Sequence, residues 1–229
     1  MPATWKNVPD EVREIVYANA LVTEPYIDKF VLQTSPSQLL SELCVVDKRT
    51  SDGATKVFYT ENRFDCSKYG VFELLGFLRK IGKNARMIRH VFLDFPSIDL
   101  TLDPVRIDST SQGKLLLIGK YCGTLDTLIL GRPENRRNVA LMPNVRDSTP
   151  EIATAIFDVL AAKITPLIHP NDVRTRVVFL IHKDDEDKFA TEHTRREFDR
   201  RRWELHVLRN LAAPTFEYPL PALPPGIHG

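Results

Sequence analysis

The chain has 229 residues, of which 43% are hydrophobic and 27% charged, and its 31 lysines and arginines nearly balance 30 aspartates and glutamates. This composition is typical of a domain with a packed core, and it excludes a collagen-like, fibrous or wholly disordered protein. The net charge of +1 gives no overall field for nucleic acid or anionic membranes, so such a partner would need a local basic patch.

The sequence shows no sign of a membrane segment or of secretion. Its longest apolar run beside a predicted strand, residues 177–181, is far below the roughly 18 residues that a spanning helix needs. The N-terminus lacks the apolar core of a secretory signal. The three cysteines, Cys44, Cys66 and Cys122, are odd in number and widely spaced, which indicates reduced, buried thiols. We therefore expect an intracellular protein, cytoplasmic or nuclear.

Residues 7–60 are expected to form a helical module. A first helix opens near Pro9, with acidic residues in its first turn. Its apolar residues recur at helical spacing along one stripe: Val12, Ile15, Val16 and Ala20. A second helix is expected to begin at Ser37 and, after a break, to resume through Phe58.

From residue 61 to 212 the pattern changes to alternating strands and helices. Strands are predicted at 62–66, 87–95, 127–130 and 176–181, and helices at 71–81, 112–122, 149–164 and 184–210. We expect an α/β fold with a small, mainly parallel sheet, either a degenerate leucine-rich-repeat-like array or an ordinary α/β sheet without repeats, and a long C-terminal helix. The end, 213–229, is a proline-rich tail without expected regular structure.

Three motifs in the first part of the chain resemble those of a known family. The run from Val8 to Leu21 resembles the opening helix of F-box domains, and more closely that of fungal F-box-like proteins with two Glu-x-Arg motifs. The run from Val57 to Phe64 is similar to the family's aromatic, Glu-Asn, aromatic signature, and residues 77–89 are similar to the helix and strand that follow. The likeness covers residues 8–95. The first Glu-x-Arg is Glu11-Val12-Arg13, whereas the second is not matched, because its position reads Arg49-Thr50-Ser51.

The resemblance implies a protein-interaction adaptor that brings a target to a cullin-type ubiquitin ligase through the ligase's linker subunit. Apolar side chains of the first helix would be left uncovered for a helical partner to bury. The residues that this implies for the partner surface are Pro9, Glu11, Arg13, Ile15 and Val16. Two alternatives stay open: the stripe packs internally against Leu39, Leu43 and Val46, or the fold serves as an interaction domain without ligase docking, since residues 24–36 separate the first two helices.

The sequence matches no catalytic or metal-binding template that we compared with it. Residues 113–120 have the wrong spacing for a phosphate loop and Tyr121 where a Ser or Thr would bind metal. The six histidines are not spaced as metal ligands. If the acidic run 184–187 is helical, its four side chains point in four directions and cannot bind one ion. We therefore expect a non-enzymatic protein with no cofactor and no metal.

One basic cluster remains. It consists of Arg195, Arg196, Arg200, Arg201 and Arg202. It could contact phosphate backbones as a weak nucleic-acid binder. However, Glu192 with Arg196 and Glu197 with Arg201 stand four residues apart, the spacing of helical ion pairs. We therefore favour a solvated capping helix at this place, and protein as the partner class.

Overall fold

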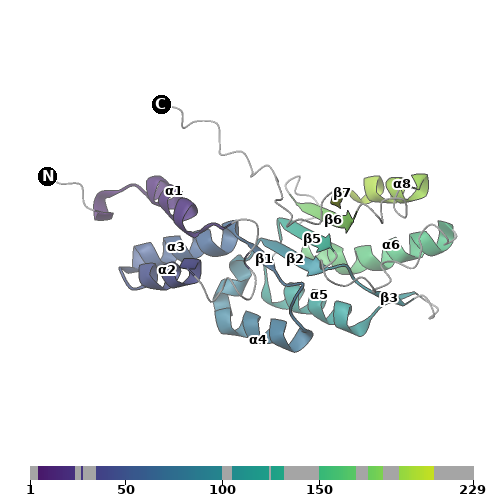
Figure 1. Cartoon of the computed structure of the whole chain (residues 1–229), viewed down its shortest axis with the longest axis horizontal. Helices are drawn as coiled ribbons and strands as arrows, with labels where there is room; N and C mark the ends of the chain where they lie inside the picture. The colour runs from purple at the N-terminus through teal and green to yellow at the C-terminus, as the bar shows by residue number, and fades with distance from the viewer. Residues whose placement is uncertain are drawn as a thin grey trace, which may run out of the picture.

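The computed structural model describes residues 5–23, 27, 35–99, 105–123, 125–131, 150–168, 175–182 and 191–208 (Figure 1). Within these ranges the chain forms seven α-helices, a parallel sheet of five strands and a small antiparallel pair. The predicted proline-rich tail, 213–229, and the acidic run 184–187 lie outside the described residues. No helix among the described residues is both long and apolar enough to cross a membrane.

The first three helices lie together at one end of the structure (Figure 1). A short 3-10 turn, Trp5–Asn7, precedes α1 (Asp10–Leu21), and α2 (Ser35–Cys44) and α3 (Lys48–Glu61) follow. Both α1 and α2 pack on α3. The start of α3 is fixed by Asp47, whose carboxylate accepts hydrogen bonds from the Thr50 backbone N–H at 2.8 Å and from the Thr50 hydroxyl at 3.0 Å.

A buried side chain, Asn62, fastens the helical part directly before the sheet begins. Its amide nitrogen donates to the carbonyl oxygens of Leu21 and Phe58, each at 2.9 Å, and its amide oxygen accepts from the backbone N–H of Thr23 at 2.9 Å. The C-terminal ends of α1 and α3 are therefore fastened at one point, directly before the first strand. Asn62 belongs to the Glu-Asn signature on which the family resemblance partly rests.

The sheet has the order β1-β2-β5-β6-β7, and every neighbouring pair is parallel. Its strands are β1 (Arg63–Asp65), β2 (His90–Asp94), β5 (Thr127–Gly131), β6 (Arg176–His182) and β7 (Trp203–Leu208). The helices between them are α4 (Val71–Ile81), α5 (Ser109–Tyr121), α6 (Pro150–Ile164) and α8 (Glu192–Arg201). The 3-10 turns Gly82–Met87 and Thr165–Leu167 follow α4 and α6, and β3 (Ile98–Asp99) pairs with β4 (Arg106–Ile107). The predicted small parallel sheet is confirmed.

The four crossover helices cover the same face of the sheet. Alternate strand residues, such as Leu128 and Phe179, share one apolar cluster with Leu74 of α4, Ile118 of α5 and Phe157 of α6. Tyr17 of α1 belongs to the same cluster, so the expected division between residues 60 and 61 runs through a continuous core. The intervening strand residues Ile129, Val178 and Leu180 form a second, smaller cluster on the opposite face.

The predicted long C-terminal helix over 184–210 is wrong. The helix α8 covers only Glu192–Arg201, and Arg202, in the left-handed region at φ 56°, ends it. The chain then turns into β7, whose Trp203 ring lies 5.0 Å from that of Phe179 and 5.9 Å from that of Phe198. The free energy gained by burying Trp203 beside β6 exceeds the helix stabilisation that the preceding charge pattern would supply.

Candidate interaction surfaces

The helix α1 presents apolar side chains outward. Val12, Ile15 and Val16 are 46%, 40% and 44% exposed. The opposite side of the helix is buried and carries Arg13, Tyr17 and Leu21. Among the described residues nothing encloses the outward side chains, which we call the α1 stripe (Val12, Ile15 and Val16). Tyr17 and Leu21 belong to the apolar core, against which Leu39 and Leu43 pack, whereas Val12, Ile15 and Val16 are not part of it.

Arg13 lies beneath this surface and fastens the turn before it. The side chain is only 3% exposed. Its Nε donates to the Val8 carbonyl oxygen at 3.1 Å, a second guanidinium nitrogen donates to the Trp5 carbonyl oxygen, and the guanidinium lies 4.9 Å from the centre of the Trp5 ring. The Trp5 indole N–H in turn donates to the Thr50 hydroxyl of α3 at 3.2 Å. Arg13 therefore holds α1 in place from inside and is not part of the exposed surface.

Two exposed ion pairs connect α1 to α3. Arg49 lies 2.7 Å from the Asp10 carboxylate, and Lys56 lies 2.8 Å from Glu14. The hydrogen bond from Arg49 holds the pKa of Asp10 below its ordinary value. Of the other expected partner contacts, Pro9 and Glu11 are exposed at the start of α1, next to the stripe. The sequence pattern identified Val12 as part of the apolar stripe, although it was not among the expected partner contacts.

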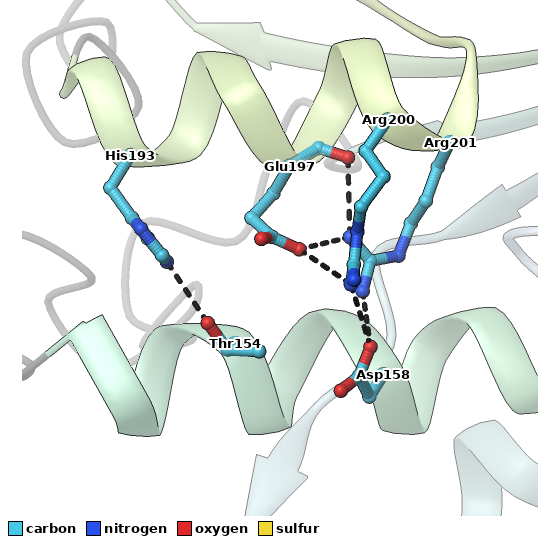
Figure 2. Close-up of polar contacts among 6 residues, drawn as sticks. All are labelled: Thr154, Asp158, His193, Glu197, Arg200 and Arg201. Atoms are coloured by element: carbon cyan, nitrogen blue, oxygen red, sulfur yellow. Dashed lines mark hydrogen bonds and ion pairs between the residues drawn. The ribbon is translucent and has the colours of Figure 1, made fainter.

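A second polar region lies between α6 and α8, which run side by side (Figure 2). Arg200 and Arg201 of α8 both contact the carboxylates of Glu197 and Asp158, and His193 lies 3.2 Å from the Thr154 hydroxyl. The guanidinium of Arg201 also stacks near two rings, 5.7 Å from the centre of Phe157 and 5.5 Å from Trp203. These contacts attach α8 to α6 by charge as well as by aromatic packing.

The predicted arginine cluster is divided by this arrangement. The side chain of Arg201 is 9% exposed and packs between α8 and α6. The other four arginines are exposed: Arg195, Arg196, Arg200 and Arg202. Both predicted helical ion pairs, Glu192 with Arg196 and Glu197 with Arg201, are confirmed. The five arginines therefore do not form one continuous basic surface.

Two further polar places lie among the described residues, beside α8 and at the carboxyl ends of the first strands. A shallow, open depression beside α8 is lined by Glu151, Thr154, Ala155 and Asp158. At the carboxyl ends of β1 and β2, Lys114 donates to the Ser67 carbonyl oxygen at 2.8 Å and to Asp94 at 2.9 Å. No group of three or more potential metal ligands occurs within the described ranges.

The two buried thiols are poorly suited to nucleophilic chemistry. Burial raises the pKa of Cys66 above the titration range of a free thiol, and it raises the pKa of Cys122 to about 12. Since the thiolate is the reactive form, both groups stay protonated and unreactive at neutral pH. Cys44 is half-buried, and all three cysteines are free.

Comparisons of this chain with models of known protein families, with curated proteins and with solved structures find no match.

Proposed function

We propose that this chain is a non-enzymatic protein-interaction adaptor that docks a helical partner on the α1 stripe. The observation that carries the proposal is the outward orientation of Val12, Ile15 and Val16 on a helix whose other side is already buried in the core. Three neighbouring apolar side chains that stay 40–46% exposed leave apolar surface in solvent, and this surface fits the groove-facing side of a partner helix.

The resemblance to fungal F-box-like proteins supports a more specific partner, the linker subunit of a cullin-type ubiquitin ligase. The resembling segment includes the α1 stripe and Asn62, the residue that fixes α1 relative to the sheet. The strand order, in which each strand pairs with the preceding one, is compatible with a degenerate leucine-rich-repeat-like array. In this proposal α1 binds the ligase, while the strand-helix array presents the target, and the chain acts by positioning alone.

The ion pairs of α1 explain how the stripe would be kept ready for binding. Asp10 with Arg49 and Glu14 with Lys56 tie α1 to α3, and Arg13 fixes the turn that leads into α1. A helix already held in this orientation loses little further freedom on binding, so more of the contact energy appears as affinity.

The test is a calorimetric titration of the full chain with a purified cullin-linker subunit. We expect saturable binding by the wild type and a loss of about 30-fold or more in affinity for Ile15→Asp or Val16→Asp, because a charge would replace an apolar anchor. Phe72→Asp is the matched control: Phe72 is the most exposed large apolar side chain of α4, away from the stripe, and its replacement should leave the affinity unchanged. Undiminished binding by Ile15→Asp would contradict the role of the stripe.

A second candidate function is an interaction domain that has the same helical module without ligase docking. Its supporting observation is at the position of the unmatched second Glu-x-Arg motif. There Thr50 is fully buried and Arg49 is paired with Asp10, so both residues serve the fold. Absence of binding by the wild-type chain to the linker subunit, with the fold intact by circular dichroism, would favour this alternative.

A further inference from the structure

Exposed lysines and arginines gather where α4 and α5 end. A Cβ atom at Gly123, directly after α5, would lie 2.6 Å from the Arg86 carbonyl oxygen, so the 3-10 turn that follows α4 lies beside the end of α5. The Arg79 Nε of α4 donates to the Tyr121 hydroxyl of α5 at 3.4 Å, and the Lys120 ammonium lies 5.6 Å from the centre of the Tyr121 ring. The exposed cations of this region, which we call the α4–α5 basic surface, are Arg79, Lys80, Lys83, Arg86 and Lys120.

These cations have no acidic neighbours, in contrast to those of α8. The chain contains no aspartate or glutamate in residues 74–93 or in residues 109–125. None of the ion pairs formed by the described residues involves the α4–α5 basic surface. Arg196, Arg200 and Arg201 of α8, by comparison, are all paired with carboxylates. In a chain of net charge +1, the α4–α5 basic surface is therefore the local basic patch that a polyanion would require.

An exposed aromatic ring lies in line with these cations. Phe72 of α4 is 88% exposed. It stands seven residues before Arg79, so both lie on the same side of the helix, about 10 Å apart along its axis. Gly76 lies between them on that side, and no heavy atom comes within 4 Å of the position that its Cβ atom would have. The side of α4 between the ring and the first cation is therefore open.

We propose that the α4–α5 basic surface and Phe72 bind single-stranded nucleic acid, with phosphate groups at the cations and a base stacked on the Phe72 ring. Every base has a π face, so stacking on an aromatic side chain requires no particular sequence, and cations along the backbone supply the remaining affinity. A duplex keeps its bases stacked on one another and can use only the cations. Because the site lies on α4 and α5, its test is independent of the α1 stripe.

Fluorescence anisotropy of the full chain with labelled oligo(U) of about 20 nucleotides tests the electrostatic part. If all five cations contact phosphates, binding should weaken about 100-fold between 50 and 200 mM salt, because each contact contributes about 0.7 to the slope of log affinity against log salt. The double variant Lys80→Gln with Lys83→Gln should reduce this slope by about 1.4. Its matched control, Arg195→Gln with Arg196→Gln, removes the same charge from α8 and should leave the slope unchanged.

Phe72→Ala tests the stacking. It should weaken oligo(U) binding about tenfold or more. Leu116→Ala is the matched control, because Leu116 is an exposed apolar side chain of α5 without a ring, and its truncation should change the affinity less than about twofold. Circular dichroism checks that all variants remain folded. Oligo(dT) of the same length is the second arm, and the tighter binder of the two identifies the strand as RNA or DNA.

The outcomes that would overturn the proposal are equally concrete. They are no binding of either strand by the wild type at 50 mM salt, or a duplex that binds as tightly as the single strands. Equal effects of the two double variants, or an unchanged affinity of Phe72→Ala, would contradict it as well. A glutamate oligomer that binds as tightly as oligo(U) would instead assign the surface to acidic protein segments.

Discussion

The surface helices α1 and α8 differ in what they present to solvent. The outward residues of α8 include Glu192, Arg195, Arg196 and Asp199, all charged, while its apolar Phe198 is buried. The outward residues of α1 include the α1 stripe, and the charge that it buries is Arg13. Single apolar side chains are exposed on other helices too, such as Phe72 of α4 and Leu116 of α5. What distinguishes α1 is that three exposed apolar side chains, Val12, Ile15 and Val16, lie together on one short helix.

The two regions also use charge differently. Ion pairs between α1 and α3 are exposed, whereas Arg201 and Glu197 of α8 have side chains only 9% and 11% exposed. Buried pairs cost much to break because one charge is left without a partner, while exposed pairs contribute little. The comparison therefore predicts that removing charges destabilises the α6–α8 region more than the α1–α3 region.

Arg201→Ala should produce the largest loss of stability. It removes one of the two arginine partners of Glu197 and the guanidinium packed on Phe157 and Trp203, so the free energy of unfolding in urea should fall by about 2–4 kcal/mol. Arg200→Ala is the control. Arg200 contacts the same two carboxylates, but its side chain is 57% exposed, and the loss should be about 0–1 kcal/mol. Equal losses would mean that burial does not distinguish the two pairs.

Gly53→Ala tests how closely α1 packs on α3. A Cβ atom at Gly53 would lie 2.9 Å from Cε2 of the buried Tyr17 ring, so the substitution should cost about 1–3 kcal/mol in urea unfolding despite the higher helix propensity of alanine. In α4, Gly76 has no atom within 4 Å of the corresponding position. Gly76→Ala should therefore stabilise the protein by up to about 1 kcal/mol. A stabilising Gly53→Ala would show that α1 can move away from α3 at little cost.

Glu204 should make the β6–β7 pair sensitive to acid. The hydrogen bond from Arg176 holds the pKa of Glu204 below its ordinary value of 4.5, so the folded chain binds fewer protons at this group than the unfolded chain. Its contribution to stability is present above about pH 4.5 and is lost as the pH falls through the lowered value. Thermal denaturation should show Glu204→Gln less stable than the wild type at pH 7, with the difference shrinking at pH 3. Arg176→Gln should reduce the same pH dependence, with the contact from His206 supplying the remainder.

Ile15→Asp should have the smallest effect on stability, within about 0.5 kcal/mol, because the side chain lies on the exposed side of α1. Leu21→Ala, a truncation on the buried side of the same helix, should cost about 2–5 kcal/mol. Urea denaturation of both variants measures the difference. A large loss for Ile15→Asp would mean that the stripe belongs to the core, and the proposed docking surface would lose its basis.

Sequence periodicity predicted much of the fold because local signals and packing agree over most elements. The helix at 71–81 coincides with α4, and its end at Gly82 has the positive φ of 59° that glycine allows. Gly53 shows the limit of this reasoning: helix propensity alone disfavours a glycine inside α3, and the close approach of the Tyr17 ring, which requires it, is visible only in the structure.

The missed strand β7 has a physical explanation. The ion pairs Glu192 with Arg196 and Glu197 with Arg201 are real, and they favour a helix that continues. What ends the helix is the aromatic packing of Trp203 with Phe157 and Phe179, residues distant in sequence, and with Phe198 of α8. The position of Arg13 was missed for a similar reason, since its acceptors are carbonyl oxygens of Trp5 and Val8, which no side-chain pattern indicates.

The sequential strand order has a consequence for how the protein folds and varies. Each strand hydrogen-bonds only to its neighbours in the order β1-β2-β5-β6-β7, so most sheet contacts join segments near one another along the chain. Such a sheet can assemble stepwise from the Asn62 junction outward, with one crossover connection to close at each step. It can also gain or lose a strand-helix unit at the β7 end during evolution without rearranging the strands already paired.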